Sequence, residues 1–520
     1  MLFFGMELNQ LVSIDLGTTN STGHMWLTNK VSCIDWNGSY LFPSTVIKDA
    51  NGLHACDLPN PRSGPLVRNF KRLLGQTYEE YRKMNYDEGT FGCDVIRGSD
   101  GNPLFRLTDD CSLSPEEAAA EVIKHIMEHA KKRYAKVDTV IVTVPANYSS
   151  RQKKATLKAV ELAGYKCFGL LPEPTAAALS YLLKQDMRRT STFLVYDFGG
   201  GTFDVSLLEY RDNKIRILQT NGDIHLGGSD IDVKVMKEVI GDYETLSGSP
   251  LLQNNSRSII RRAKLLLASK DAKEALGTQK YYTISLDGIF GDDIDEDYSS
   301  IEFTQDKLNG CTKNSVEQTW RIVDETIMME NKKRNDLQLG AFNIGNITGV
   351  ILVGGSSKLP GVRDLINRFF KPTQIIDLDP YTSVGEGAFL HARNMSQAEG
   401  HITVQTALGC DIGLGVDTNM VYRLFPRFSN LPCSCFLTVN LDRENRNTLK
   451  TALFEGRMDV ETMDATNCSL VRKITLPIPE GTVVHECILR CDLEEGYYFT
   501  ITCLNPITRQ ALCDPMSVNF

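Results

Sequence analysis

The chain has 520 residues, of which 42% are hydrophobic and 23% are charged, and its formal net charge is -9. This length exceeds what one hydrophobic core supports, so we expect about three or four globular domains. The net negative charge argues against a dedicated nucleic-acid-binding protein. The first residues of the chain lack the positive charge of a signal peptide, and no apolar run is long enough to cross a membrane.

The first predicted element is a β-hairpin in residues 11–27. Its turn, residues 15–19, has the sequence DLGTT and lies between two apolar runs. Glycine lets backbone N–H groups approach a phosphate closely, and threonine hydroxyls add further donors. An aspartate beside a phosphate would be repelled unless a divalent cation lay between them, so the turn predicts a site for Mg²⁺ and a nucleotide.

Strands and helices then alternate along the chain. A helix is expected after Ser114, which precedes a proline and two glutamates, and residues 137–144 predict a buried strand. A helix over 150–164, a strand over 167–171 and a helix that begins at Glu173 follow. This order is typical of an α/β fold with a mainly parallel sheet.

The hairpin design occurs a second time in residues 193–208. Here the turn, residues 197–202, has the sequence DFGGGT. One such turn would be weak evidence, because short glycine-rich turns are common. Two turns of one design suggest two related lobes that clamp a single nucleotide.

The α/β pattern continues beyond this second hairpin. Helices are expected over 228–240 and 256–270, and a buried strand over 350–353. The strand runs into a glycine–serine turn at 354–357, and a helix begins near Pro360. The carboxyl end of a strand is where α/β sheets bind ligands, so this turn is a third candidate for nucleotide contact.

The pattern changes completely from about His401. Short alternating strands are expected over 421–425, 435–439 and 451–454, separated by turn residues, with no helical periodicity. The sequence therefore predicts a separate all-β domain, with residues 394–400 as the linker.

The fourteen cysteines do not show the spacing of a zinc site, and eight of them lie in the last fifth of the chain. We expect reduced thiols that act as small hydrophobic side chains, in preference to disulfides or bound metal. Cys433 and Cys435 flank a serine, and strand alternation would place both thiols on one face.

Several of these motifs, in this order, resemble the signatures of the Hsp70 chaperone family. The segments that carry the resemblance are residues 14–21, 142–146, 173–178, 197–204, 225–230 and 353–360. The C-terminal part resembles the substrate-binding β-sandwich of that family through Leu431-Pro432 and residues 452–456.

The resemblance implies an α/β fold: an actin-like, ribonuclease H-like, two-lobed ATPase domain followed by an all-β sandwich. The helical lid that follows this sandwich in the family is not expected, because the sequence stops at Phe520. The expected divisions are lobe I in 1–190, lobe II in 191–378, a return helix and linker in 379–400, and a substrate-binding-like β-sandwich in 401–520.

The resemblance also implies ATP and Mg²⁺ as ligands and assigns roles to matching residues. Asp15 and Asp197 would hold the hydrated Mg²⁺, and Lys71 would orient the attacking water and offset charge on the γ-phosphate. Taken singly, such residues also fit a solvated lysine or a surface acid. The catalytic set is Lys71, Glu173, Asp197, Thr202 and Asp204, and the expected nucleotide contacts are Gly17, Thr18, Thr19, Asn20, Gly199, Gly200, Gly201, Thr202, Gly228, Lys264, Gly354, Gly355, Ser356 and Lys358.

Departures from the family pattern concern the nucleoside end of the site. Three family positions that carry Glu, Arg and Ser are expected to correspond to Arg261, Leu265 and Ala268 of this chain. Ser229 replaces a usual glutamate, and Lys358 replaces a usual arginine. Because these side chains contact the ribose and the base in the family, weaker nucleotide affinity or relaxed base preference is expected.

Further details, in residues 146–148, 227–232 and 452–456, resemble the Hsp70 homologues of the closteroviruses, which are filamentous plant viruses. The implied function is an Mg²⁺-dependent and weakly active ATPase that couples its nucleotide state to the binding of extended peptides. The narrower resemblance implies a role in virion assembly and in movement of the virus between cells.

Alternatives remain open at this point. One is a non-hydrolysing, Hsp70-like component of an assembly, another is a divergent cellular Hsp70 co-chaperone without a lid, and the most distant is a sugar or acetate kinase of the same fold. Expected partners are unfolded peptide segments, viral coat protein and J-domain co-chaperones, without direct nucleic-acid specificity. The expected location is the cytoplasm, including the host cytoplasm, the virion or the plasmodesmata of an infected cell.

Overall fold

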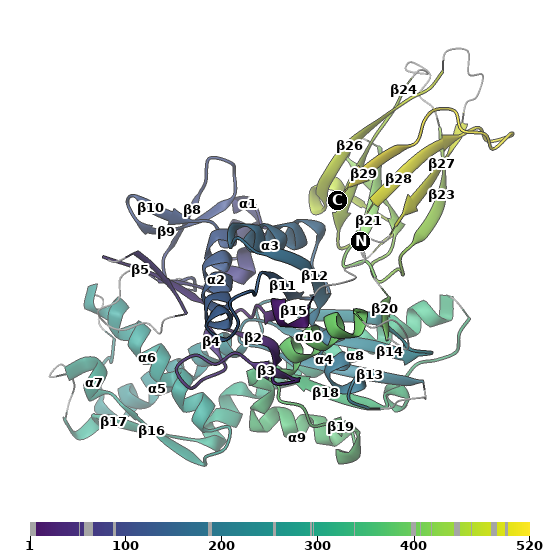
Figure 1. Ribbon diagram of the computed structural model, residues 1–520. Coiled ribbons are helices and arrows are strands. Elements are labelled where there is room, and N and C mark those ends of the chain that lie inside the picture. The colour runs from purple at the N-terminus through teal and green to yellow at the C-terminus, as the bar shows by residue number, and fades with distance from the viewer. Residues whose placement is uncertain are drawn as a thin grey trace. The chain divides into compact units, whose positions relative to one another are not determined.

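The computed structural model divides into two compact units by their internal contacts (Figure 1). Unit 1 comprises Met1–Pro145, Ala155–Asn213 and Gln219–Ile402, and unit 2 comprises Ala146–Lys154, Lys214–Leu218 and Thr403–Phe520. The structure describes residues 7–50, 52–56, 66–86, 90–185, 190–252, 256–291, 294, 296–336, 338–396, 402–405, 407–417, 419–440, 448–458, 460–479, 486–494 and 498–519.

The first large sheet of unit 1 has the strand order β12-β11-β1-β2-β3, with the short strand β4 paired to β2. Strand β1 pairs antiparallel with β2 and parallel with β11, which in turn pairs parallel with β12. The predicted first hairpin is therefore confirmed. The strands are β1 (Leu11–Asp15), β2 (Asn20–Leu27), β3 (Lys30–Cys33), β4 (Phe42–Pro43), β11 (Thr139–Val144) and β12 (Lys166–Pro172).

The first five strands of the second large sheet repeat this topology, in the order β19-β18-β13-β14-β15. Strand β13 pairs antiparallel with β14 and parallel with β18, and β18 pairs parallel with β19. The second hairpin is thus confirmed, and each sheet places its hairpin turn at the carboxyl end of a strand with a parallel neighbour. The strands are β13 (Ser191–Phe198), β14 (Phe203–Arg211), β15 (Lys214–Asp223), β18 (Gly349–Val353) and β19 (Ile375–Ile376).

The expected helices of unit 1 are present. Ser114 accepts a hydrogen bond from the Glu117 backbone, and the Glu117 carboxylate bonds back to the Ser114 N–H, so a capping box opens α2. Helix α5 extends seven residues beyond its predicted end at 240, to Ser247. The helices are α1 (Tyr78–Lys83), α2 (Pro115–Arg133), α3 (Ser150–Leu162), α4 (Glu173–Leu182), α5 (Gly228–Ser247), α6 (Ser256–Ala275), α7 (Asp287–Phe290), α8 (Gln305–Asp336), α9 (Pro360–Phe369) and α10 (Ser383–Met395).

Smaller sheets complete unit 1 around these elements. A three-stranded sheet has the order β6-β5-β7, another has the order β10-β9-β8, and β16 pairs with β17. Their strands are β5 (Thr45–Asp49), β6 (Gly52–Ala55), β7 (Leu66–Arg68), β8 (Asp94–Arg97), β9 (Pro103–Thr108), β10 (Cys111–Leu113), β16 (Tyr281–Ser285) and β17 (Ser300–Thr304).

Helix α10 returns the chain from the second sheet to the first. The hydroxyl of Ser13 on β1 donates to the Gly385 carbonyl of α10 at 2.6 Å. A Cβ on Gly387 would lie 1.8 Å from the Ala176 carbonyl oxygen of α4, so glycine permits this close helix–helix approach. The return helix therefore lies on β1 and α4, the elements that lead to the first hairpin turn and to Glu173.

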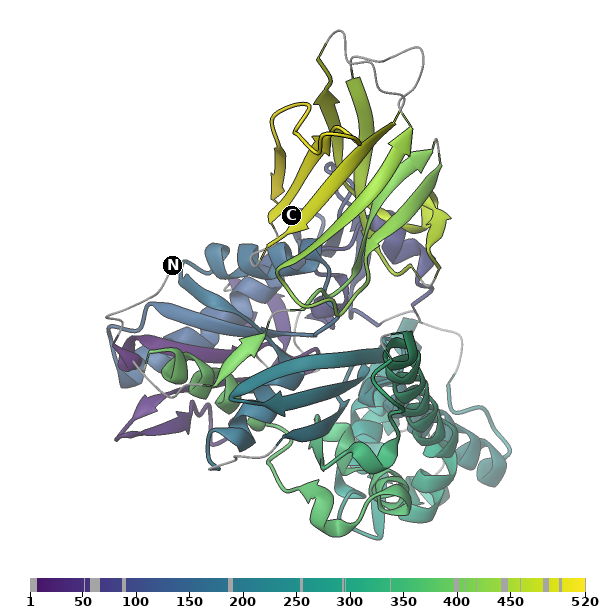
Figure 2. The same ribbon diagram turned by 90° about the vertical axis from the view of Figure 1, so that its right-hand side faces the viewer.

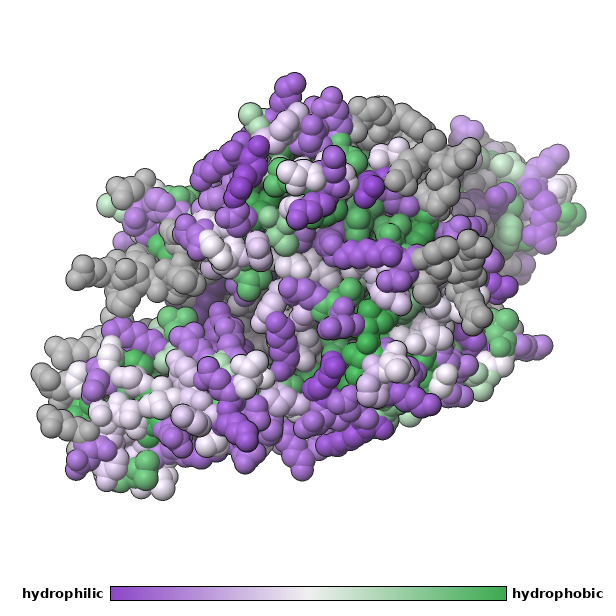
Figure 3. Space-filling view, turned by 60° about the horizontal axis from the view of Figure 1, so that its bottom comes forward, coloured by the Kyte–Doolittle hydropathy of each residue, from purple (hydrophilic) through white to green (hydrophobic). Residues whose placement is uncertain are grey.

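The hydrophobic core of the first sheet lies beneath helix α2. Val12 and Ile14 of β1 and Val142 of β11 are fully buried, and they belong to one cluster with Ile123 and Ile126 of α2. Polar and charged residues dominate the face drawn in Figure 3, where hydrophobic residues occur in separate groups. No described helix is both long enough and apolar enough to cross a membrane.

Unit 2 is built on two antiparallel sheets with the orders β25-β22-β21-β24-β26 and β23-β27-β28-β29. Inward-facing residues of both sheets form one hydrophobic core, and Figure 2 shows the two sheets side by side. The predicted change to an all-β pattern is confirmed for the described residues. The strands are β20 (Thr403–Gln405), β21 (Asp411–Asp417), β22 (Met420–Phe425), β23 (Cys433–Asn440), β24 (Thr448–Gly456), β25 (Thr462–Asp464), β26 (Ser469–Pro477), β27 (Glu486–Leu493), β28 (Tyr498–Leu504) and β29 (Met516–Asn519).

Two shorter segments also belong to unit 2: Ala146–Lys154, which includes the first residues of α3, and Lys214–Leu218, the first residues of β15. Strand β20 pairs in parallel with Lys214–Arg216, the first residues of β15. The backbone N–H of Ser150 donates to the buried Glu455 carboxylate of β24 at 2.7 Å. All fourteen cysteines are free thiols, as the sequence predicted.

Candidate functional site

Unit 1 contains a cavity of about 720 Å³ at the carboxyl ends of β1, β13 and β18. Residues at the turn after each of these strands line it: Asp15 with 17–20, Asp197 with 199–202, and 353–358. All three glycine-containing turns that the sequence singled out therefore meet at one cavity, as expected for ligand sites in α/β sheets.

The two hairpin turns approach each other closely at the cavity. A Cβ on Gly200 would lie 2.1 Å from Thr19 Oγ1, and one on Gly201 would lie 2.4 Å from a side-chain carbon of Thr18. Only glycine fits at this approach. Thr19 Oγ1 is buried and has no hydrogen-bond partner among the described residues, so it can donate to an anion placed between the turns.

Carboxylates surround a single lysine at the floor of the cavity. Lys71 Nζ lies 2.7 Å from Glu173 Oε1, and each side chain is 10% exposed. Thr143 donates to Asp15 Oδ1 at 2.6 Å. Lys71 lies in the 3₁₀ helix Phe70–Leu73, and Glu173 is the first residue of α4, where the helix dipole favours an acid.

The two aspartates of the hairpin turns are destabilised as anions. Burial, then the nearby Glu173, raises the pKa of Asp15 from 3.8 to about 6. Burial also raises the pKa of Asp197 well above its usual value, with repulsion from Glu173, Asp204 and Asp15 acting in the same direction. Lys71 offsets this repulsion only partly.

These observations fit a divalent cation. Hard cations such as Mg²⁺ prefer carboxylate and water oxygens, and a double positive charge between Asp15 and Asp197 would remove their mutual repulsion. The adjacent turns supply backbone N–H groups and the unpartnered Thr19 hydroxyl for phosphate. The chain thus offers the donor set that a Mg²⁺-bound nucleotide needs, in which the metal supplies charge neutralisation of the phosphates.

The end of the cavity nearest α6 differs from the sequence expectation. Lys264 does not line the cavity, and Leu265 is fully buried. Arg261 donates to the Phe290 carbonyl of α7 at 3.0 Å. The residues of this region that do line the cavity are Lys270, Lys273, Glu274, Gly277 and Thr278.

The correction is a shift of nine residues along α6. The cavity-lining positions 270, 273, 274 and 277 have the same spacing as the predicted positions 261, 264, 265 and 268. The predicted spacing therefore agrees with the structure, but each predicted position lies nine residues too early in the chain. Nine residues correspond to about two and a half turns, which places the two sets on opposite faces of the helix. The sequence signal exists, because Asp271-Ala272-Lys273 repeats the pattern of Arg262-Ala263-Lys264.

Lys273 is held in place at the end of the cavity nearest α6. Its ammonium group lies 2.7 Å from Asp232 of α5, with both side chains about 90% buried, and donates to the Gly228 carbonyl at 3.1 Å. Lys270 lies 3.9 Å from Glu274. The charges that face the cavity from α6 are therefore mixed, and one lysine is neutralised by a buried carboxylate.

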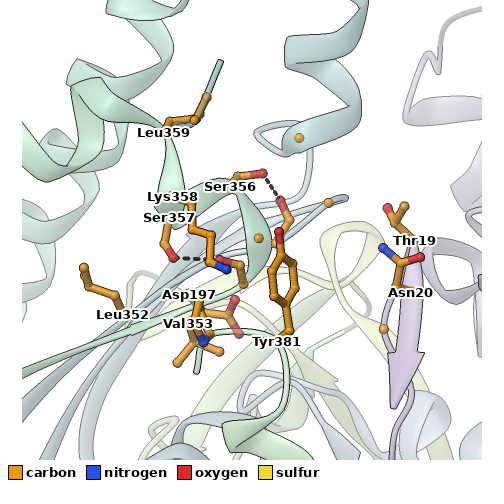
Figure 4. Close-up of a pocket in the computed structure, with 18 of the residues that line it drawn as sticks. Thr19, Asn20, Asp197, Leu352, Val353, Ser356, Ser357, Lys358, Leu359 and Tyr381 are labelled. Carbon is orange, nitrogen blue, oxygen red and sulfur yellow. Dashed lines mark hydrogen bonds between the residues drawn. The ribbon is translucent and has the colours of Figure 1, made fainter. Parts of the chain in front are cut away.

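An aromatic residue that the sequence did not single out completes the lining. Lys358 Nζ lies 4.2 Å from the centre of the Tyr381 ring, within the range of a cation–π contact. A Cβ on Gly355 would lie 2.6 Å from that ring, so the ring packs on the glycine turn. Figure 4 shows the ring between Lys358 on one side and Thr19 and Asn20 on the other.

Most of the predicted site residues line this one cavity. Asp204 does not, because it lies on β14 opposite Asp197 and accepts a hydrogen bond from Thr202 Oγ1 at 2.8 Å. Lys264 is the other exception. The predicted residues that line the cavity are Asp15, Gly17, Thr18, Thr19, Asn20, Lys71, Glu173, Asp197, Gly199, Gly200, Gly201, Thr202, Gly228, Gly354, Gly355, Ser356 and Lys358.

Two sheets of one topology, whose hairpin turns enclose a cavity rich in glycine, threonine and carboxylates, define a two-lobed ATPase fold of the actin-like class. The chain belongs to the Hsp70 family: the family model described as Hsp70 protein matches residues 11–492. Members of this family are ATP-binding chaperones and ATPases that use Mg²⁺, and they bind peptide substrates and J-domain partners.

Proposed function

We propose that this chain hydrolyses Mg²⁺-ATP in the cavity of unit 1. The supporting observation is the group of buried carboxylates around Lys71, which faces two glycine–threonine turns. Asp15 and Asp197 would hold the metal with its water ligands, and the turns would hold the phosphates. Lys71 would position the attacking water and stabilise charge on the γ-phosphate, because phosphoryl transfer depends on positioning and electrostatics more than on a covalent group.

Single-turnover hydrolysis of Mg²⁺-ATP tests this proposal directly. Wild-type protein should convert bound ATP to ADP, whereas Asp197→Asn and Lys71→Met should lose hydrolysis by about a hundredfold or more. Lys83→Met, a change of an exposed lysine on α1, should leave the rate unchanged. ATP binding without conversion in wild type would instead favour the non-hydrolysing assembly component.

We also propose that unit 2 binds extended peptide segments in response to the nucleotide state. The support is family membership together with an all-β unit whose outer surface exposes large hydrophobic side chains, among them Phe436, Leu470 and Tyr498. Strand-edge pairing and apolar contacts are the means by which such a unit recognises peptides. Fluorescence anisotropy of a labelled hydrophobic peptide, with ATP or ADP present, tests this; equal affinities would contradict the coupling.

A role in the assembly of filamentous virus particles, and in movement of the virus between the cells of a host plant, is the narrower proposal. Its support is the sequence resemblance of residues 146–148, 227–232 and 452–456 to the closterovirus homologues. Co-sedimentation of the purified chain with filaments reassembled from a closterovirus coat protein tests it. Failure to sediment with them would leave the ATPase proposal intact.

A further inference from the structure

The inward face of the sheet β23-β27-β28-β29 carries a concentration of thiols. Cys433, Cys435, Cys487, Cys491 and Cys503 all pack into the hydrophobic core of unit 2. Cys435 on β23 and Cys491 on β27 are register partners, directly opposite each other across an antiparallel pair.

The two thiols differ in their access to solvent. Cys491 is fully buried, whereas Cys435 is half-buried. The adjacent Cys491 thiol lowers the pKa of Cys435, and the adjacent Cys435 thiol, together with burial, raises the pKa of Cys491. The reachable thiol of the pair is thus also the one that ionises more readily, which is the pattern of an attacking cysteine beside a resolving one.

The backbone geometry suits a covalent link between them. Opposite residues in an antiparallel pair have Cα atoms about 4.5–5.5 Å apart. This separation lies inside the range of about 4.4–6.8 Å that a disulfide requires. The link would close on side chains that already point into the same core.

Cys487 and Cys503 also shift each other's pKa in opposite directions, but no neighbouring cysteine among the described residues is both directly opposite another thiol and partly exposed. Cys433, two residues away on the same face of β23, is opposite Leu493 and has no thiol across from it. Cys487 and Cys503 are offset by two residues across β27 and β28, because Leu489 is the register partner of Cys503. Such diagonal positions are about 7–8 Å apart, and both of these thiols are fully buried.

We propose that Cys435 and Cys491 form a reversible oxidation site, which a peroxide converts into a cross-strand disulfide within unit 2. The Cys435 thiolate attacks one peroxide oxygen, the O–O bond breaks, and hydroxide leaves and takes up a proton, so that Cys435 becomes a sulfenic acid. The Cys491 sulfur then attacks the Cys435 sulfur, its proton passes to the departing oxygen, and water leaves as the S–S bond forms. Two thiols and one peroxide yield one disulfide and two waters.

This site is independent of the cavity in unit 1 and of the proposed ATPase activity. A disulfide between β23 and β27 would join two strands that are separated in sequence by β24, β25 and β26. Closing such a long loop restricts the unfolded chain, so oxidation should raise the thermal unfolding temperature of unit 2.

Mass mapping of the intact, full-length protein tests the proposal. Reduced protein is freed of reductant, treated with hydrogen peroxide, alkylated and digested. We expect a linked peptide pair that contains Cys435 and Cys491 and that disappears after treatment with dithiothreitol. Cys433, on the same strand and face, serves as the internal control and should remain open to alkylation.

Two variants sharpen the result. Cys433→Ser should keep the linked pair, and Cys435→Ser should abolish it and the rise in unfolding temperature. Sulfinic acid at Cys435 beside an unmodified Cys491, or a bond from Cys435 to any other cysteine, would overturn the proposal. If Cys435→Ser fails to unfold cooperatively, the peptide map of the wild-type chain alone decides.

Discussion

Lys71 and Glu173, which are 102 residues apart in the sequence, form a buried ion pair with an N–O distance of 2.7 Å at the floor of the cavity. The pair holds the one lysine among several carboxylates in a fixed place, because α4 positions Glu173 and the 3₁₀ helix after β7 positions Lys71. A fixed ammonium group costs little reorganisation when charge develops on a phosphate.

Replacement of Lys71 should therefore affect chemistry more than nucleotide binding. We expect Lys71→Met to slow single-turnover hydrolysis by about a hundredfold or more, while the affinity for ADP changes by only about a fewfold. Glu173→Gln should slow the same step less, because the lysine remains. Equal losses in ADP affinity and in hydrolysis rate for Lys71→Met would show that the lysine serves binding instead.

The raised pKa of Asp15 predicts a pH dependence of stability in the metal-free protein. Its native pKa of about 6 exceeds the unfolded value of 3.8, so the native state binds this proton more tightly than the unfolded state. The native state therefore loses stability as the pH rises from about 4 to about 6, by on the order of 2–3 kcal/mol at neutral pH. Asp197 contributes in the same direction.

Urea unfolding of wild type and Asp15→Asn, with metal removed, measures this effect. The variant should be more stable than wild type at about pH 7.5, and the difference should shrink at about pH 4.5, where the wild-type carboxyl is protonated. Mg²⁺ with ADP should stabilise wild type and not the variant. Parallel stability curves for the two proteins across this pH range would contradict the assignment of the repulsion to Asp15.

A methyl group added at Gly200 should block phosphate binding at the two hairpin turns. Its Cβ would lie 2.1 Å from Thr19 Oγ1 on the facing turn, so Gly200→Ala must push the two turns apart. We expect a loss of Mg²⁺-ATP affinity of at least about tenfold, measured by isothermal titration calorimetry.

The matched control is Gly241→Ala in the middle of α5. A Cβ there meets no atom within 4 Å, and alanine favours a helix, so this change should raise stability by about 0.5–1 kcal/mol and leave ATP affinity unaltered. An unchanged affinity in Gly200→Ala would show that the nucleotide does not lie between the two turns.

The sequence predicts those parts of the site that depend on local chemistry. The turns at 15–19 and 197–202 carry their own signal, because glycine, threonine and aspartate between two apolar strands have few other uses. Strand and helix order followed equally from periodicity, so the two sheets and the all-β unit were predictable.

The nucleoside end depends on tertiary register, and there the sequence was ambiguous. Helix α6 contains two similar triplets nine residues apart, and only packing decides which one faces the cavity. The family pattern predicts a contact by Lys264 in the first triplet, whereas Leu265 next to it is fully buried. Tyr381 belongs to no sequence motif that would identify it as a site residue. It lies in the connection between β19 and α10, and only the folded structure brings it to the cavity.

Tyr381 and Lys358 together form a surface on which a nucleobase can stack, and this leads to the most discriminating prediction for base recognition. The ring lines the cavity beside the glycine turn, and Lys358 Nζ lies 4.2 Å from its centre. Stacking on an aromatic ring with a neighbouring cation contributes about 1–2 kcal/mol. We expect Tyr381→Leu to weaken ATP binding by about 5- to 30-fold.

Inorganic tripolyphosphate separates this effect from the phosphate end, because it lacks a base and a ribose. Its affinity, measured with Mg²⁺ by the same calorimetry, should be unchanged in Tyr381→Leu, and Tyr381→Phe should bind ATP as wild type does because it keeps the ring. Lys358→Ala should reproduce part of the loss for ATP. If tripolyphosphate and ATP weaken together in Tyr381→Leu, the ring supports the turn at 354–358 and does not contact the base.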